Sequence, residues 1–502
     1  MSASRIGSFN PGTSDFGTSD NTDFVQPGET TLAQVATRMG VDLNSLLQAN
    51  PQIKDPNNLS PQWIHRPLTS SAESAHDSDN STQSVPTDLP KAPMGDPLAA
   101  SAFKAKLANM DGTDRTCPGV NACVNYQGSP EFQALPAATR NKLLQEAAND
   151  PSVEMRLDQI MQQPEYGNLS TKQRTELLNV FASANPQGRE ELVTLMNRQL
   201  PSGQSALLSP DKSSSGATLL DNLNQLATEP LAPAVAGRRS EILGQVISDT
   251  AEPTWYLDQG QVGTCAPTSL QTALLINSPS EYARLLGGLL GTNRQATLAN
   301  GDTMIPALND LTSPATVAPN GGASIPDSRS ITERVFQSAL AQYSYVKGGE
   351  AAPIVNASGD IPGLSPKEIA LAQSGLYGQN YTAADTHTIF GVGGLDAQVL
   401  SELSKGHGPV PVSLHWNNGG HEVLVDKIEM DKKGNIQVYI RNPWGSRDAR
   451  GTGYKDGAVL GTAANNSNAG PLRTVVDSQS GLEVMSNQDF LKALYGAVVP
   501  SD

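Results

Sequence analysis

The spacing of hydrophobic residues predicts helices in the middle of the chain and strands near its end. Apolar residues recur at helical spacing through most of residues 101–250 and again over 265–274. Further on, apolar and polar residues alternate over 410–414, 421–425 and 436–440, with polar turn residues between these segments. The pattern therefore predicts a helical region, then one further helix, then a set of hairpin strands.

The helical region contains an internal echo, since six residues recur after 34 positions. Such a period predicts two copies of one helical unit. The Trp-Leu-Gly and Tyr signature of tetratricopeptide repeats is absent, and two copies are few for a solenoid. A helical spacer or presentation domain is therefore favoured over a peptide-binding groove. The echoed residues are Pro130, Phe132, Leu135, Arg140, Leu143 and Leu144, which return as Pro164, Tyr166, Leu169, Arg174, Leu177 and Leu178.

A short unit near the start of the chain has a β-α-α-β pattern. An extended piece around Phe24 precedes a Pro-Gly turn, and a helix follows with apolar residues on one face over 32–39. Asp42 can cap a second helix that ends at Asn50-Pro51. Residues 59–64 can then return as a strand.

This unit, residues 23–67, resembles a LysM domain. The resemblance implies binding of N-acetylglucosamine polymers such as peptidoglycan or chitin, or a role as an assembly module in phage tails and secretion devices. An additional Thr after Glu29, and Pro61-Gln62 where Pro-Gly is usual, depart from the family pattern. A small packing or docking module is the alternative. The residues that carry the resemblance are Val25, Gly28, Glu29, Leu32, Ala36, Gly40, Val41, Leu46 and Asn50-Pro51.

Composition divides the rest of the 502 residues into ordered parts and connectors. Residues 1–22 and 68–100 are rich in Ser, Asp, Asn and Thr, and are expected to be a disordered N-terminus and a flexible linker. Between and after them, the sequence predicts the LysM-like domain at 23–67, the helical spacer at 101–250 and a catalytic domain at 251–502.

The net charge of −16 argues against a nucleic-acid or anionic-membrane partner, because such partners are bound by basic patches. No apolar run is long enough for a membrane span. The first residues lack the apolar core of a signal peptide. We therefore expect a cytoplasmic protein, or one that is exported by a specialised, non-Sec secretion system.

Three cysteines are too few for a disulfide framework. Cys117 and Cys123 are close enough in sequence to pair, and Cys265 stands alone. This set fits a secreted protein with one reactive cysteine, or a cytosolic protein with three free thiols.

Cys265 is expected at a helix N-terminus, because Pro267 suits a first helical turn. There the helix dipole favours the thiolate, which is the nucleophilic form. Gly260 and Gly263 allow a tight turn beneath the sulfur. The Gln259 amide and the Cys265 backbone N–H could donate to a developing oxyanion. The alternative is a buried cysteine that acts as a small hydrophobic residue.

His421 and Asn442 supply a base and an orienting group, as a cysteine nucleophile requires. A hairpin places the start of one strand beside the end of the next, so the Asn442 side-chain oxygen can accept a hydrogen bond from His421. Trp444 can cover that bond and exclude water. His415 is the rival base, but the alternation puts it on the opposite face from Leu414. Asn442 as a simple turn residue is the alternative to an orienting role.

Four blocks in this part of the chain resemble the papain-like cysteine peptidases, and most closely the calpain-type core. Cys, His and Asn come in the papain order, and the resemblance covers about residues 250–500. It implies an α+β domain in which the helix of Cys265 packs against an antiparallel sheet that carries His421 and Asn442. The blocks are Gln259-Gly260-x-x-Gly263-x-Cys265, Gly420-His421, Arg441-Asn442-Pro443-Trp444-Gly445, and residues 481–494 with Met485, Ser486, Asp489 and Phe490.

The chain also departs from the calpain pattern. Ala266 stands where the family usually has Trp, and the calcium-binding acidic loops have no counterpart. Residues 291–360 and 446–475 form long inserts that could act as lids or substrate loops. No spacing typical of a zinc site is present, so neither a metal nor another cofactor is expected.

The resemblance implies hydrolysis of a peptide bond in a protein or peptide substrate. In this reaction Cys265 acylates, His421 transfers the proton, Asn442 orients the ring and Gln259 stabilises the oxyanion. The same groups can deamidate or transfer a side-chain amide, as in papain-like bacterial effectors delivered through a secretion apparatus. A non-catalytic glycan-binding or assembly adaptor is the competing class. A further alternative is that residues 1–250 form a removable segment that blocks the active-site cleft.

Overall fold

In the computed structural model helices dominate residues 126–377 and most strands lie within residues 381–500, so the fold is α+β. The chain divides into two compact units, one formed by residues 13–118 and the other by residues 1–12 with 119–502. The structure describes residues 22–24, 33, 36, 63–65, 126–260, 262–306, 316–317, 325–350, 363–385, 391–416, 419–444, 454–461 and 470–501.

In the smaller unit, strand β1 (Thr22–Phe24) pairs antiparallel with β2 (Trp63–His65). Ala33 and Ala36 are helical, and Ala36 is buried. The outer strands of the expected β-α-α-β pattern therefore pair, and β2 ends one residue beyond the predicted strand. The other residues that carry the LysM resemblance lie outside the described residues, as do Cys117 and Cys123. Glycan binding and the pairing of these cysteines stay predictions.

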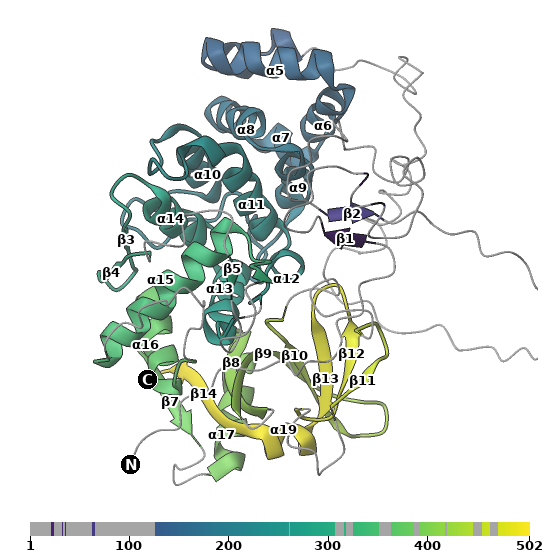
Figure 1. The fold of residues 1–502 in the computed structure, drawn as a ribbon, viewed down its shortest axis with the longest axis vertical. Helices are drawn as coiled ribbons and strands as arrows, with labels where there is room; N and C mark the ends of the chain where they lie inside the picture. Colours follow the sequence, from purple (N-terminus) through teal and green to yellow (C-terminus); the bar gives the residue numbers. More distant parts are fainter. Residues whose placement is uncertain are drawn as a thin grey trace, which may run out of the picture. The chain divides into compact units, whose positions relative to one another are not determined.

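The described part of the larger unit begins with a stack of helices, drawn in blue in Figure 1. The predicted 34-residue repeat corresponds to a repeated pair of helices. In each copy a short helix with Pro at its first turn precedes a longer one. Arg140 donates to the Leu135 carbonyl in the first copy, and Arg174 to the Tyr166 carbonyl in the second. The helices are η1 (Tyr126–Gly128), α4 (Pro130–Ala134), α5 (Ala137–Asn149), α6 (Pro151–Met161), α7 (Pro164–Asn168), α8 (Thr171–Ser183), α9 (Pro186–Asn197), α10 (Leu219–Thr228), η2 (Ala236–Arg238) and α11 (Arg239–Ala251).

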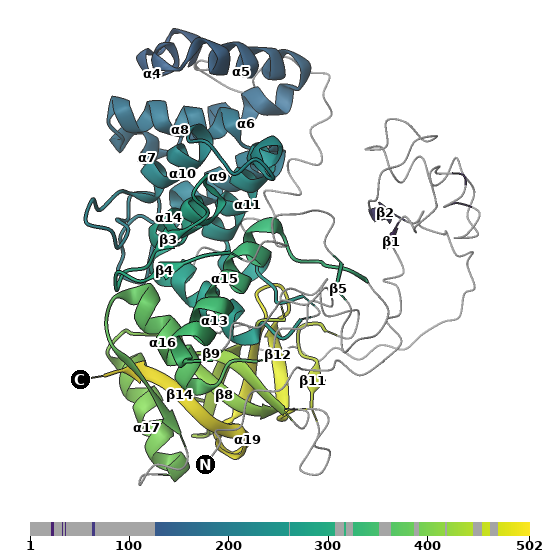
Figure 2. The ribbon, with the colours of Figure 1, turned by 60° about the vertical axis from the view of Figure 1, so that its left-hand side comes forward.

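A second group of helices continues the same hydrophobic core. One cluster of buried residues extends from Tyr126 to Leu376 and also includes Val498 and Cys265. The core is therefore continuous across residue 250, where the sequence predicted a domain boundary, and α10 and α11 of the first group pack against α14 and α15 of the second (Figure 2). The helices are α12 (Pro253–Tyr256), α13 (Cys265–Asn277), α14 (Pro279–Leu290), α15 (Ile331–Gly348) and α16 (Pro366–Tyr377).

An eight-stranded antiparallel sheet completes the larger unit, in the order β11-β12-β13-β10-β9-β8-β14-β7. The three strands predicted from alternation are adjacent here as β8, β9 and β10. The strands are β7 (Tyr381–Asp385), β8 (Val410–Trp416), β9 (Gly419–Met430), β10 (Ile436–Arg441), β11 (Val459–Leu460), β12 (Arg473–Asp477), β13 (Leu482–Ser486) and β14 (Leu494–Pro500). Two small ribbons lie outside the sheet, β3 (Ala296–Thr297) with β4 (Thr303–Met304), and β5 (Thr316–Val317) with β6 (Ile325–Pro326).

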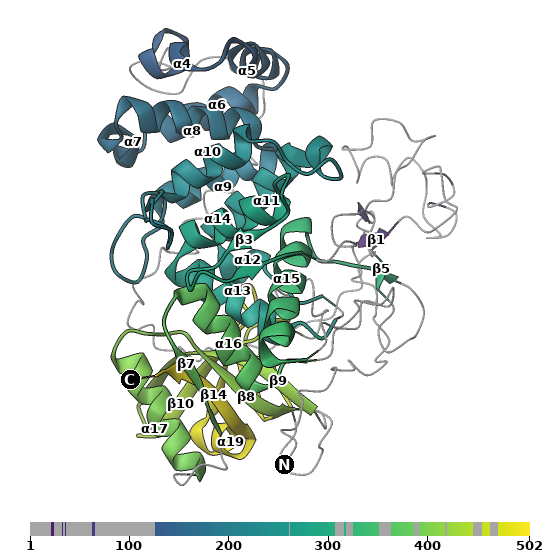
Figure 3. The same ribbon diagram turned by 90° about the vertical axis from the view of Figure 1, so that its left-hand side faces the viewer.

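The two faces of the sheet pack against different helices. α17 (Gly391–Ser404) and α19 (Asn487–Ala493) cover one face, where Leu414, His421 and Val423 point. On the other face α13 packs against β8 and β9, as Figure 3 shows. Ser269 of α13 donates to the Glu422 carbonyl. The helix of Cys265 therefore packs against the strand of His421, as expected.

None of the helices in the described part of the chain combines the length and apolar character that crossing a membrane requires.

Two glycines allow α9 and α11 to pack closely, and alanine at one of them is expected to destabilise the protein. A Cβ at Gly188 would lie 2.5 Å from Gly244 Cα, and a Cβ at Gly244 would clash with the Asn185 side chain that caps α9. We expect Gly244→Ala to lower the free energy of unfolding by about 2–3 kcal/mol, through overpacking and loss of the cap. Urea unfolding of the full chain measures this effect.

Gly287→Ala on α14 is the matched control. There the nearest atom to a new Cβ is Leu226 Cγ at 3.7 Å, an ordinary contact. This variant is expected to be stabilised by about 0.5–1 kcal/mol. Equal effects of the two substitutions would contradict the close packing of α9 on α11.

Candidate active site

Cys265 is the first residue of α13 and is preceded by a loop that α15 holds in place. The Thr264 hydroxyl donates to the Gln337 side chain, and Gln337 Nε2 donates to the Asp258 carbonyl. Thr264, Gln337 and Cys265 are all buried. The position of the sulfur is therefore fixed by buried hydrogen bonds from a separate helix.

The first glycine of this loop lies where a side chain would be costly. Gly260 has φ +59°, in the left-handed region, and a Cβ there would lie 3.0 Å from Arg329 Cγ. Its N–H donates to the Asp258 carboxylate. Gly263 is buried in the bend that leads into α13. The tight turn predicted from these glycines is present.

Gln259 links the cysteine loop to the segment that follows β10. Its backbone N–H donates to the Pro443 carbonyl at 2.9 Å, and its side-chain Nε2 donates to the Val262 carbonyl at 3.0 Å. An amide nitrogen carries two N–H groups, so the bond to Val262 leaves the second available for an oxyanion. The Gln259 and Asn442 blocks, far apart in sequence, are thus neighbours.

The electrostatics of Cys265 differ from the expectation. Burial raises the pKa of the thiol to about 12, since a thiolate there would lose its water. The backbone N–H groups of Glu422, Ala266 and Cys265 itself oppose this increase, and the Glu422 carboxyl adds to it. The helix N-terminus therefore acts in the predicted direction, but desolvation outweighs it. In this closed conformation the neutral thiol is favoured.

His421 and Asn442 form the predicted hydrogen bond. His421 Nε2 lies 3.0 Å from Asn442 Oδ1, and both side chains are buried. Glu422, the residue after His421, faces Cys265 across the contact between β9 and α13. The sulfur therefore lies next to the backbone that carries the imidazole, on the face of the sheet opposite to the one where the His421 ring points.

Two tryptophans enclose the His421 ring. Trp444 lies 5.1 Å from it and Trp416 lies 4.8 Å from it, measured between ring centroids. The Trp444 backbone N–H also donates to Asn442 Oδ1. Trp444 thus covers the hydrogen bond as predicted. The packing of Trp416 on the imidazole was not predicted from the sequence. Gly445 lies outside the described residues.

His415, the rival base, takes no part in the His421–Asn442 pair, although its neighbour Tyr495 lies near Cys265. It is exposed on β8, with its ring 4.5 Å from that of Tyr495. Its neighbour Leu414 is buried and pairs with His421. The alternation along β8 therefore placed His415 on the opposite face from His421, as expected.

A buried polar cluster that was not predicted from the sequence lies beyond Asn442. Asn442 Nδ2 donates to the Glu483 carboxylate at 3.2 Å, and Arg473 Nε donates to the same carboxylate at 2.7 Å. Glu483 is fully buried on β13, two residues before buried Met485. An acidic residue at a position whose alternation points inward was the signal that could have found it.

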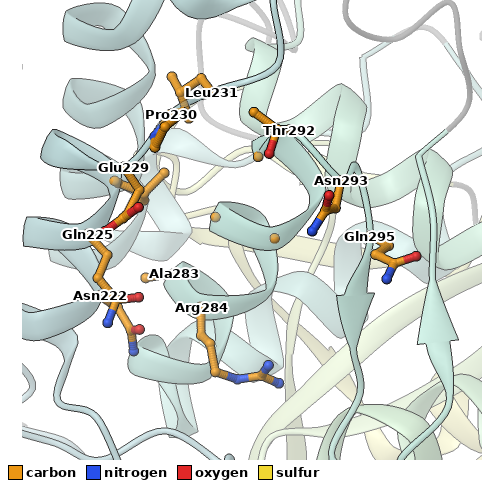
Figure 4. Close-up of a pocket in the computed structure, with 14 residues that line it drawn as sticks. Asn222, Gln225, Glu229, Pro230, Leu231, Ala283, Arg284, Thr292, Asn293 and Gln295 are labelled. Carbon is orange, nitrogen blue, oxygen red and sulfur yellow. The ribbon is translucent and has the colours of Figure 1, made fainter.

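A cavity of about 360 Å³ lies away from these residues, between α10 and α14 (Figure 4). Asn222, Gln225 and Arg284 contribute polar groups to its wall, and none of the candidate catalytic residues lines it. Arg284 already pairs with Glu281 and donates to the Thr297 carbonyl. Across the described residues, no three His, Cys, Asp or Glu side chains come together in a metal-binding group.

Comparisons with known proteins add no family. No protein-family model matches the chain, and no curated protein matches it.

Proposed function

We propose that the chain is a cysteine-nucleophile amide hydrolase of the papain-like kind, with a peptide bond as its substrate. The hydrogen bond from His421 Nε2 to Asn442 Oδ1 carries this proposal, together with Cys265 at the start of the helix that packs on the same strand. A buried imidazole held by an amide oxygen and covered by Trp444 is oriented as a general base needs to be, and the proposed proton transfer further requires the ring to come within hydrogen-bond reach of the sulfur.

In the proposed reaction, His421 Nδ1 accepts the Cys265 proton and Sγ attacks the amide carbonyl carbon. The carbonyl oxygen takes the negative charge, and the Cys265 backbone N–H and Gln259 Nε2 donate to it. His421 then gives its proton to the departing amine, which leaves a thioester. Water, deprotonated by the same imidazole, hydrolyses the thioester and restores the thiol.

The closed conformation sets a condition on this reaction. The Cys265 side chain is only 4% exposed and His421 is fully buried, so a substrate reaches the sulfur only after a local opening. Opening admits water and substrate dipoles, and removes part of the desolvation that raises the thiol pKa.

A non-catalytic adaptor is the second candidate, and the same burial favours it. A cysteine with a pKa of about 12 is an unreactive thiol at neutral pH, and it serves as a small buried hydrophobic residue. The two candidates differ in whether a substrate acylates Cys265.

The test is incubation of the full chain with a peptide library, read by mass spectrometry. We expect new peptide termini that are absent with Cys265→Ala. Cys117→Ala, which removes another of the three cysteines, is the matched control and is expected to retain the wild-type yield.

Conversion of Gln or Asn side chains to acids without new termini would instead indicate a deamidase. Cleavage that persists in Cys265→Ala would contradict the proposal. No modified peptide at all from a folded protein would favour the adaptor.

A further inference from the structure

Glu483 lies on the far side of Asn442 from His421, and its carboxylate is held from several directions. Besides Asn442 and Arg473, the Tyr454 hydroxyl donates to Glu483 Oε1 at 3.0 Å. The side chains of Glu483 and Arg473 are both buried and form an ion pair. A buried carboxylate with hydrogen bonds to ordered partners is rigid, because moving it would leave charged groups unpaired.

The chemistry of these groups determines how the Asn442 amide is oriented. An ionised carboxylate only accepts hydrogen bonds, so it requires the amide nitrogen on its side. The amide oxygen must then face His421, and an amide oxygen also only accepts. Nε2 of His421 is therefore the ring nitrogen that carries the proton, and Nδ1 keeps its lone pair.

Arg473 connects the same carboxylate to the rings around His421. Its guanidinium carbon lies 4.2 Å from the centre of the Trp416 ring and 5.9 Å from that of Trp444. These two rings pack on the imidazole. One ion pair therefore supports both the amide that binds the ring and the aromatic walls around it.

We propose that Glu483 is a positioning residue, which holds the Asn442 amide so that His421 keeps its proton on Nε2 and exchanges protons with Cys265 through Nδ1. This inference deepens the proposed function and rests on His421 being the base. Glu483 touches neither the sulfur nor the imidazole in this role, and sets the ring tautomer through Asn442.

The test is a spectroscopic one that needs no substrate. The full chain is labelled with ¹⁵N-histidine, and the Nε2–H signal of His421 is identified by its absence from His421→Ala. We expect wild type to show this signal at neutral pH, with slow exchange against water. Glu483→Gln is expected to lose it or to mix it with an Nδ1–H signal, since a Gln amide no longer requires one orientation of Asn442.

Glu281→Gln is the matched control, because Glu281 is also fully buried and paired with an arginine, Arg284. It is expected to leave the His421 signal unchanged. If Glu483→Gln alone does not fold, Glu483→Gln with Arg473→Met removes both charges together, and the same loss of signal is expected.

An unchanged Nε2–H signal in the folded Glu483 variant would overturn the inference, and so would a wild-type ring protonated on Nδ1. These outcomes are separate from failure of the proposed function. A chain that cleaves nothing but loses the signal in Glu483→Gln would retain the positioning role and lose only the hydrolase.

Discussion

Replacing His421 with alanine is expected to lower kcat/KM for amide hydrolysis by about 10²–10⁴-fold, the range of a general base. In the proposed reaction the imidazole takes the Cys265 proton, and a thiol whose pKa is raised to about 12 would depend strongly on such a base. The measurement is the initial rate of cleavage of the best peptide from the library. A second readout is the rate of Cys265 alkylation by iodoacetamide, compared with wild type across pH.

His415→Ala is the matched control, since His415 lies on the adjacent strand and is exposed. It is expected to leave the cleavage rate near that of wild type. A large loss with His415→Ala and none with His421→Ala would reverse the assignment of the base. Equal losses in both variants would indicate damage to the β8–β9 hairpin, which thermal unfolding of each variant would reveal.

The alternation of apolar residues was sufficient to predict the strands that matter for the site. It placed β8, β9 and β10 correctly and brought Asn442 to the end of β10, beside His421. These elements were predictable because a hairpin is local, and its register follows from the turn and from the buried face. The 34-residue echo was predictable for the same reason, as each copy buries the same positions.

The supports of the site were less predictable, because they come from distant parts of the chain. Gln337 on α15 holds the cysteine loop, and Glu483 on β13 holds Asn442. For neither residue does the surrounding sequence contain a pattern that predicts its contact with the site. Strand alternation marked Glu483 as buried, but it gave no partner.

Burial around Cys265 was the other unpredicted feature. The sequence predicted the helix N-terminus correctly, and a helix dipole has a known sign. How much water the surrounding elements exclude depends on their packing, which no local pattern specifies. The predicted direction of the shift in the thiol pKa was therefore wrong, although the helix N-terminus acts with the expected sign.

Substituting Glu422 with glutamine is expected to remove the effect of pH on stability at this site, so that the variant is the less stable protein at low pH and the more stable one at high pH. Burial raises the pKa of the Glu422 carboxyl from 4.5 to about 8, and only the Ser413 hydroxyl, among the causes of the shift, acts against it. The folded state therefore binds the proton more tightly than the unfolded state. Stability from this group is full below about pH 4.5, falls as pH rises towards 8, and then stays low.

The cost of ionising Glu422 in the folded state is on the order of 5 kcal/mol, from a shift of three to four pKa units. Glutamine cannot ionise, so the variant avoids this cost. Its amide nitrogen would occupy the place of Oε1, which accepts no hydrogen bond from the described residues, and this costs about 1–3 kcal/mol at every pH. We expect Glu422→Gln to be less stable than wild type at pH 5 and more stable at pH 9.

The other titratable groups that face Glu422 do not cause this change in the order of stability between pH 5 and pH 9. Cys265 on α13 and Tyr495 on β14 have pKa values raised far above this range by burial, so neither ionises between pH 5 and 9. His415 on β8 lies beside Tyr495 and is exposed. Urea unfolding at both pH values measures the crossing, with Glu429→Gln, an exposed carboxylate on the same strand, as the control. Parallel pH profiles for wild type and Glu422→Gln would mean that this carboxyl is hydrated in the folded protein, and that the Cys265 side of the sheet is already open to water.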